Sequence, residues 1–185
     1  MRHLATLLLA SALLWAQPLR AESAGAKYTE FAGFRLGQHN LADVQGRLGS
    51  APIKHVGDAG DSEYSICYSV PGGSVRFMSG ELGGNSHELL GFGISSQPPM
   101  QECAAWPASL PIPALHVSAL RVGMTRSAFI RQIGRKVRWA GQMGQASYHS
   151  VGSAGSVPTE VLITVEATFR ANRLLSFTVW RAETT

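Results

Sequence analysis

The stretch FRLGQHNLADVQGRLG at residues 34–49 has a counterpart, LRVGMTRSAFIRQIG, at residues 120–134. From Asn40 to Gly49 and from Thr125 to Gly134, the two segments keep a constant spacing of 85 residues. The segments LGFGI (90–94) and LSFTV (175–179) resemble each other at the same spacing. A period of this length predicts one small domain written twice rather than a solenoid of short units.

Each copy is expected to open with a short helix. Asn40 and Thr125 are good N-cap residues, because their side-chain oxygens can accept the unpaired backbone N–H groups of a first turn. Gly49 and Gly134 stand where a left-handed residue commonly ends a helix. Between these limits apolar residues recur at helical spacing: Leu41, Val44 and Leu48 in the first copy, and Phe129, Ile130 and Ile133 in the second.

Strands follow each helix. We expect them over 64–70, 74–79 and 89–95, with 51–56 as a candidate edge strand, and over 137–140, 146–151, 160–170 and 173–181 in the second copy. Residues 81–85 are expected to form a loop. The turn at 171–172 predicts a final hairpin, whose apolar face carries Val161, Ile163, Val165, Ala167 and Phe169 opposite Leu175, Phe177 and Val179. The fold class is therefore α+β: two tandem repeats, each a short helix or helix pair packed on an antiparallel sheet.

The first 21 residues are typical of a secretory signal peptide. Arg2 and His3 precede an uncharged apolar stretch, Pro18 interrupts it, and Ala21 is a plausible cleavage residue. The alternative is an uncleaved anchor, although the stretch is short for a membrane span. No Cys lies near the cleavage site to take a lipid. We expect a mature chain that begins near Glu22 and is periplasmic or secreted, with no transmembrane segment.

The predicted organisation of the mature chain is a first repeat at 22–96, a Pro-rich linker at 97–115 and a second repeat at 116–185. Residues 97–113 hold five prolines, a composition that argues against regular helix or sheet. Residues 22–29 are expected to be a loose start.

The charge of the chain is uneven. The whole sequence carries +4, and removing Arg2 and Arg20 with the signal leaves 14 basic and 12 acidic residues, a net of +2, which is too little to indicate nucleic acid. Residues 22–115 have a net charge of −4, whereas residues 116–185 have +6. Divergence between two solvated copies explains this asymmetry; the alternative is a second half that meets an acidic partner or an anionic envelope surface.

Two cysteines, Cys67 and Cys103, occur in the chain. An oxidising compartment would let them form a disulfide between the first copy and the linker. Free thiols or an intermolecular bridge remain alternatives. Neither cysteine belongs to a CxxC motif, so redox catalysis is not indicated.

The segment VGMTR at 122–126, followed by Phe129, Ile130 and the Ile133-Gly134 pair, resembles the opening of each repeat in the β-lactamase-inhibitory protein family. The small lipoprotein of the outer-membrane β-barrel assembly machinery carries a similar motif. The resemblance implies tandem units of a helix on an antiparallel sheet. The first copy departs from it, with GQHN at 37–40, and so does the cysteine count, because those inhibitor repeats carry a disulfide each. The resemblance therefore carries the fold and not the target, and specific β-lactamase inhibition is not expected.

No catalytic, metal or cofactor site is predicted. The six histidines are scattered, without metal-ligand spacing. Residues 58–63 offer oxygen ligands for a hard cation but lack the register of an EF-hand loop, and a polar hairpin loop explains them. No G-x-S-x-G elbow is present. A hydrolase whose site a single sequence does not reveal stays an alternative.

Binding residues are sought among exposed aromatic and charged side chains, which anchor many protein interfaces. The candidates are Trp139 and Trp180, their neighbours Arg138 and Arg181, and Glu81 with Asn85 at the tip of a loop over 80–88. Aromatics on strands are just as often core. The leading prediction is an exported, non-enzymatic module that binds another protein of the cell envelope. The alternative is an envelope-maintenance factor that docks on an outer-membrane assembly component.

Overall fold

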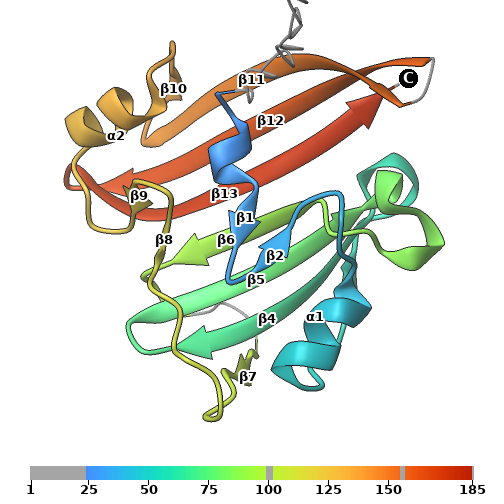
Figure 1. Ribbon diagram of the computed structural model, residues 1–185. Coiled ribbons are helices and arrows are strands. Elements are labelled where there is room, and N and C mark those ends of the chain that lie inside the picture. The colour runs from blue at the N-terminus through green and yellow to red at the C-terminus, as the bar shows by residue number, and fades with distance from the viewer. Residues whose placement is uncertain (1–23, 99–101, 155–156, 185) are drawn as a thin grey trace, which may run out of the picture.

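The computed structural model describes residues 24–98, 102–154 and 157–184. A nine-stranded, mostly antiparallel sheet dominates this part of the chain, and its main strand order is β10-β11-β12-β13-β6-β5-β4-β3 (Figure 1). The two helices and two small hairpins lie on one side of the sheet (Figure 1). The α+β class expected from the sequence is confirmed.

The elements of the first half run in the order η1 (Ala26–Tyr28), β1 (Glu30–Phe31), β2 (Phe34–Arg35), α1 (Leu41–Leu48), β3 (Lys54–Val56), η2 (Ala59–Asp61), β4 (Glu63–Val70), β5 (Gly73–Gly80), η3 (Glu81–Ser86) and β6 (Gly91–Ser95). The rest of the chain forms β7 (Ala104–Ala105), β8 (His116–Val117), β9 (Leu120–Arg121), α2 (Arg126–Ile133), β10 (Arg138–Ala140), β11 (Met143–Ala154), β12 (Val157–Arg170) and β13 (Arg173–Thr184). The hairpins β1–β2 and β8–β9 were not expected, since two-residue strands leave little pattern in a sequence.

Both helices begin at the residues that the sequence indicated. Asn40 accepts a hydrogen bond from the Asp43 backbone N–H, while the Asp43 carboxylate accepts one from the Asn40 backbone N–H, which completes a capping box. Thr125 caps α2 through the Ala128 N–H. Gly134 ends α2 in the left-handed conformation, but Gly49 does not match that expectation. Its φ of 87° combines with an extended ψ of 163°, a region that only glycine populates readily.

The strands of the two halves lie in one sheet. Strand β6 of the first half pairs antiparallel with β13 of the second, with Thr178 opposite Gly93 and Trp180 opposite Gly91. On its other side β6 pairs with β5. The seam between the halves is therefore a continuous hydrogen-bonded ladder at the centre of the sheet.

The final hairpin forms as predicted, with one change of register. Ala171 and Asn172 both have positive φ, as a two-residue hairpin turn requires. An irregularity between Thr168 and Phe169 shifts the pairing near the turn. As a result Leu174 is fully buried, whereas the sequence placed Leu175 on the apolar face. A bulge of this kind is set by local geometry and leaves no trace in the alternation of residues.

The core fills the space between the sheet and the layer of helices and hairpins. Tyr28, Phe34 and Phe129 reach it from that layer and are fully or almost fully buried, as are Phe77, Phe92 and Phe177 from the sheet. The prediction of a loose start over 22–29 is wrong for its described residues. Tyr28 has no exposed surface, and its hydroxyl donates to the Gln132 carbonyl over 2.9 Å. This contact ties the start of the described chain to the end of α2.

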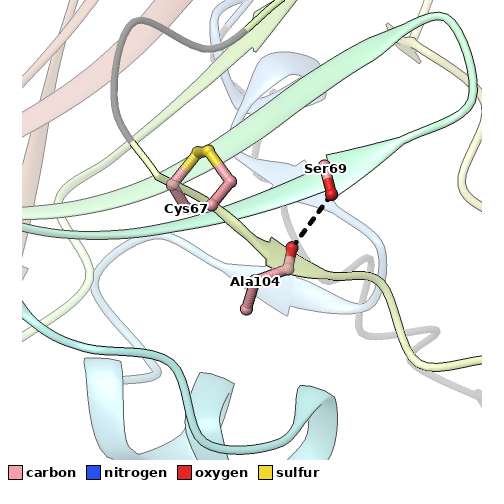
Figure 2. The surroundings of a disulfide bond; sticks show 4 residues. Cys67, Ser69 and Ala104 are labelled. Atoms are coloured by element: carbon pink, nitrogen blue, oxygen red, sulfur yellow. Dashed lines mark hydrogen bonds between the residues drawn. A yellow bond between two sulfur atoms is a disulfide. The ribbon is translucent and has the colours of Figure 1, made fainter.

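Cys67 and Cys103 are joined in a disulfide, so the predicted pairing is confirmed (Figure 2). Beyond the bond, Ala104–Ala105 forms β7, which pairs parallel with β4, and the Ser69 hydroxyl donates to the Ala104 carbonyl over 3.2 Å (Figure 2). The expectation that the linker holds no sheet is therefore wrong at these two residues, which lie in the proline-free segment between Pro99 and Pro107. Trp106 continues the attachment, because its backbone N–H donates to the Ser69 carbonyl.

The predicted signal peptide lies outside the described residues. Within the part of the chain that the structure describes, no helix has both the length and the apolar character needed to cross a membrane.

Candidate functional site

The sheet has two unlike faces. Along each strand, every second side chain points towards the helices and belongs to the core. The other side chains point to the opposite side of the sheet, which we call the open face. Across β4, β5, β6, β13 and β12 the open face combines larger side chains, among them Arg76, the buried Met78 and Trp180, with many small ones. The residues with a hydroxyl or no side chain are Ser65, Ser69, Ser74, Gly80, Gly91, Gly93, Ser95, Thr164, Thr168, Ser176 and Thr178. A face built this way lets another molecule approach the sheet backbone closely.

A shallow cavity of about 430 Å³ lies at the centre of the open face, over the seam between β6 and β13. Gly93 lies in its floor, and Ser74, Ser95, Ser176 and Thr178 surround it. A Cβ built on Gly93 would stand 3.5 Å from the Thr178 Oγ1, so a methyl group would fit there in ordinary van der Waals contact. The cavity is therefore lined by hydroxyl groups that can both donate and accept hydrogen bonds.

Arg76 is the charged residue of this cavity. It stands opposite Gly93 on β6 and opposite Cys67 on β4. One guanidinium nitrogen lies 3.3 Å from the Glu63 carboxylate, and the side chain is 42% exposed. Because a guanidinium has five N–H donors, this single contact leaves most of its hydrogen-bonding capacity available.

Trp180 is the largest side chain on the open face, and it lies against Gly91 of the neighbouring strand. A Cβ on Gly91 would stand 2.7 Å, 2.9 Å and 3.0 Å from three ring atoms of the indole, so the ring covers the space that the glycine leaves. The indole is half-buried. The Trp180–Gly91 pair follows the Thr178–Gly93 pair on the same face, so Trp180 presents an aromatic surface beside the cavity.

Trp139, the other predicted aromatic anchor, belongs to the opposite face. Its ring contacts Phe129 of α2 and Phe169 of β12, and the Arg126 guanidinium lies 3.7 Å from the ring centroid. It is 36% exposed. Arg138, next to it in the chain, stands opposite Gln145 and points to the open face at the β10 edge. The two tryptophans therefore do not share one platform.

Arg181, Glu81 and Asn85 lie at the end of the sheet near η3. Arg181 is 17% exposed and forms ion pairs with Glu183 and Glu88, so it is already engaged. Residues 81–86 form short helical turns with a kink at Gly84, where a loop was expected. Glu81 and Asn85 line a cavity of about 400 Å³ with Tyr64 and His87. The predicted site residues are thus distributed over three surfaces.

The open-face residues Arg76, Gly91 and Gly93 were not singled out from the sequence. Arg76 is one of 16 basic residues and stands in no motif. Only the pairing of β6 with β13 brings Gly91 next to Trp180 and Gly93 next to Thr178. A signal was present in the alternation of Gly91 and Gly93 with the buried Phe92 and Ile94, since glycine inside a strand marks a close approach.

The described residues offer no group of three or more His, Cys, Asp or Glu side chains that could hold a metal ion. The chemistry that the open face supports is recognition through hydrogen bonds, one guanidinium and one indole.

Comparison with known proteins adds little to this geometry. No family model matches the chain, and no curated protein matches its sequence. Among solved structures, the chain has a likeness to a Streptococcus mutans protein that is provisionally named a β-lactamase inhibitor protein. The match covers 78% of this chain and 82% of that one at 8% identity, with a TM-score of 0.25. A likeness this distant carries no argument about fold or function.

Proposed function

We propose that this chain is an exported, non-enzymatic protein-binding module whose partner contacts the open face. The observation that carries the proposal is the centre of that face, where Gly93 leaves the sheet backbone accessible between Arg76 and the indole of Trp180, which lies on Gly91. Small side chains permit close approach of a partner's backbone. Tryptophan and arginine are the residues that most often dominate binding energy at protein interfaces.

The partner is expected to present an acidic side chain to Arg76. Glu63 contacts the guanidinium through one oxygen at 3.3 Å, which leaves room for a second carboxylate. The hydroxyls of Ser74, Ser176 and Thr178 have no hydrogen-bond partner among the described residues and can serve the same ligand. An acidic residue flanked by an apolar side chain, the latter set against Trp180, matches this arrangement.

Export is part of the proposal. The predicted signal peptide at 1–21 and a mature start near Glu22 are consistent with the disulfide between Cys67 and Cys103, because such bonds persist in oxidising compartments. The periplasm or the extracellular space is the proposed location.

Duplication of one ancestral unit, with repeats at 22–96 and 116–185, is also proposed. Matching backbone contacts support it: Gly37 N–H donates to the Leu89 carbonyl as Gly123 N–H donates to the Leu174 carbonyl. The bridges Asn40–Glu88 and Thr125–Arg173 occupy corresponding places.

Photo-crosslinking tests the function. A photoreactive phenylalanine analogue is placed at Thr164 or Thr178 on the open face and, as a control, at Gln45 on α1, and each protein is irradiated in envelope extract of the source organism. We expect one crosslinked species from the open-face positions, absent from the α1 position and lost when Trp180→Ala is added. Capture from α1 alone, or capture that Trp180→Ala leaves unchanged, would refute the assignment of the open face.

A second candidate is an envelope-maintenance factor that docks on an outer-membrane assembly component through the second half. The favouring observation is electrostatic: nine basic residues lie between 116 and 185, and among the described ion pairs only Arg181 of these takes part. Crosslinks from α2 rather than from the open face would favour this candidate.

A further inference from the structure

A pocket of about 770 Å³ lies between the β8–β9 hairpin, α2 and the start of β13, on the helix side of the sheet. Four basic side chains line it: His116, Arg121, Arg131 and Arg173. No carboxylate is among its lining residues, and none of the four belongs to an ion pair within the described part of the chain. We call it the basic pocket.

Separate elements bring these four side chains together. His116 stands directly opposite Arg121 in the register of β8–β9. Arg131 comes from the sixth position of α2. Arg173 opens β13, and its guanidinium donates to the Gly123 carbonyl over 3.1 Å, which fixes it at the pocket. Three guanidinium groups around one pocket concentrate positive charge there, and this charge favours the binding of an anion.

The first half of the chain shows the same geometry with balanced charge. There Glu30 stands opposite Arg35 in β1–β2, and the two form a 2.6 Å ion pair. Glu88 makes the backbone bridge to Asn40 that Arg173 makes to Thr125. The sixth position of α1 is Gly46. Two acidic residues of the first half are thus replaced by basic ones in the second, and a third basic residue is added.

We infer that the basic pocket binds a phosphate-type anion that carries more than one negative charge. Guanidinium groups match the oxygens of phosphate in pairs, and several of them around one pocket suit an anion with more than one charge. The four side chains are exposed, so a ligand reaches them from solvent. The anion is either free or part of a phosphomonoester headgroup. This site lies on the helix side, so it is separate from the open face and does not depend on the proposed function.

Calorimetry with inorganic pyrophosphate at low ionic strength tests the site in the mature chain. We expect binding to wild type that weakens by about tenfold or more in Arg121→Gln and in Arg131→Gln, because each removes charge-assisted hydrogen bonds. Arg138→Gln is the matched control, since it removes the same charge from the opposite face. Arg173→Glu places an acidic residue where the first half has Glu88, and it is expected to abolish binding. Arg173→Lys keeps the positive charge but lacks the guanidinium that contacts the Gly123 carbonyl, so it distinguishes the effect of the charge from that of the contact.

Sedimentation with vesicles distinguishes the two sources. One set contains phosphatidylcholine alone and the other equimolar phosphatidylcholine and phosphatidic acid. Binding of pyrophosphate alone supports a free anion, and vesicle binding that Arg121→Gln and Arg131→Gln abolish supports a headgroup. Absence of both, or binding that these variants and Arg138→Gln weaken equally, would overturn the site.

Discussion

The indole of Trp180 lies against Gly91 across the seam where the two halves of the sheet meet, so that a Cβ on the glycine would stand 2.7 Å from the ring. Gly93, two residues along the same strand, has no such neighbour, and its nearest atom would be 3.5 Å away. The two glycines therefore have different reasons to be glycine. One accommodates an aromatic ring, and the other keeps a cavity open.

Replacement by alanine is therefore expected to affect stability differently at the two glycines. Gly91→Ala forces the indole off its position and is expected to lower the free energy of unfolding by about 1–3 kcal/mol. Gly93→Ala is expected to change it by no more than about 0.5 kcal/mol. Urea denaturation of both variants checks the prediction. Equal losses would show that the ring does not rest on Gly91.

The disulfide is expected to contribute strongly to stability. Cys67 and Cys103 are 36 residues apart, and closing a loop of that length stabilises a fold by about 3–4 kcal/mol in the chain-entropy model. We expect the Cys67→Ser/Cys103→Ser double variant to lose about this amount in urea denaturation, and wild type with reductant to lose the same. A loss in only one of these two experiments would indicate that the serines, or the reductant, act in another way.

Stability is expected to fall at alkaline pH. Burial raises the pKa of Tyr68 to about 12, and the pKa values of Tyr28 and Tyr148 are raised by burial as well. In the unfolded chain these three phenols ionise at pH ~10, whereas in the folded chain they stay neutral to higher pH. Their contribution to the free energy of unfolding is therefore complete below pH ~10 and is lost as the pH rises towards the pKa values of the folded state.

Urea denaturation at several pH values from about 8 to 11.5 measures this fall. Tyr68→Phe removes one ionising phenol together with its 2.7 Å hydrogen bond to the Gly49 carbonyl. The variant should be less stable at neutral pH and should show a shallower alkaline slope. An unchanged slope would contradict the role of Tyr68.

Helix α1 depends on its capping box. Asn40→Ala removes the acceptor for the Asp43 N–H at 2.9 Å and is expected to cost about 1 kcal/mol, within the usual range for such caps. Thr125→Ala removes a longer bond of 3.3 Å and should cost less. A double-mutant cycle of Asn40→Ala with Asp43→Ala should show coupling, because each side chain accepts a hydrogen bond from the backbone N–H of the other residue. Additive losses would argue against the box.

The helices and main strands were predictable because their residues carry local signals. The side chains of Asn40 and Thr125 cap the helices that follow them, so these residue types predict the helix starts. Phe92 and Phe177 belong to segments in which apolar residues alternate with small or polar ones, a pattern that predicts half-buried strands. The burial of Tyr28 was not predictable in this way. Its hydroxyl reaches Gln132, 104 residues along the chain, and such a contact has no local pattern.

The candidate site was predicted less well than the fold. Trp180 was selected as an exposed aromatic, yet its partner Gly91 becomes visible only once β6 is paired with β13. Trp139 was grouped with it, although a register set by β10 and β11 turns that ring to the opposite face. Residue type indicates which side chains can bind, but the pairing of strands distant in sequence decides which of them share a surface.

Hydroxyl-radical footprinting of the two tryptophans tests the central claim most directly. Trp180 lies on the open face and Trp139 on the other side of the sheet, so each serves as the reference for the other. The mature chain is oxidised alone and in complex with the partner captured from envelope extract, and modification of each ring is measured by mass spectrometry. Binding through the open face predicts that Trp180 becomes protected in the complex while Trp139 reacts as before. Protection of Trp139 with Trp180 unchanged would contradict it.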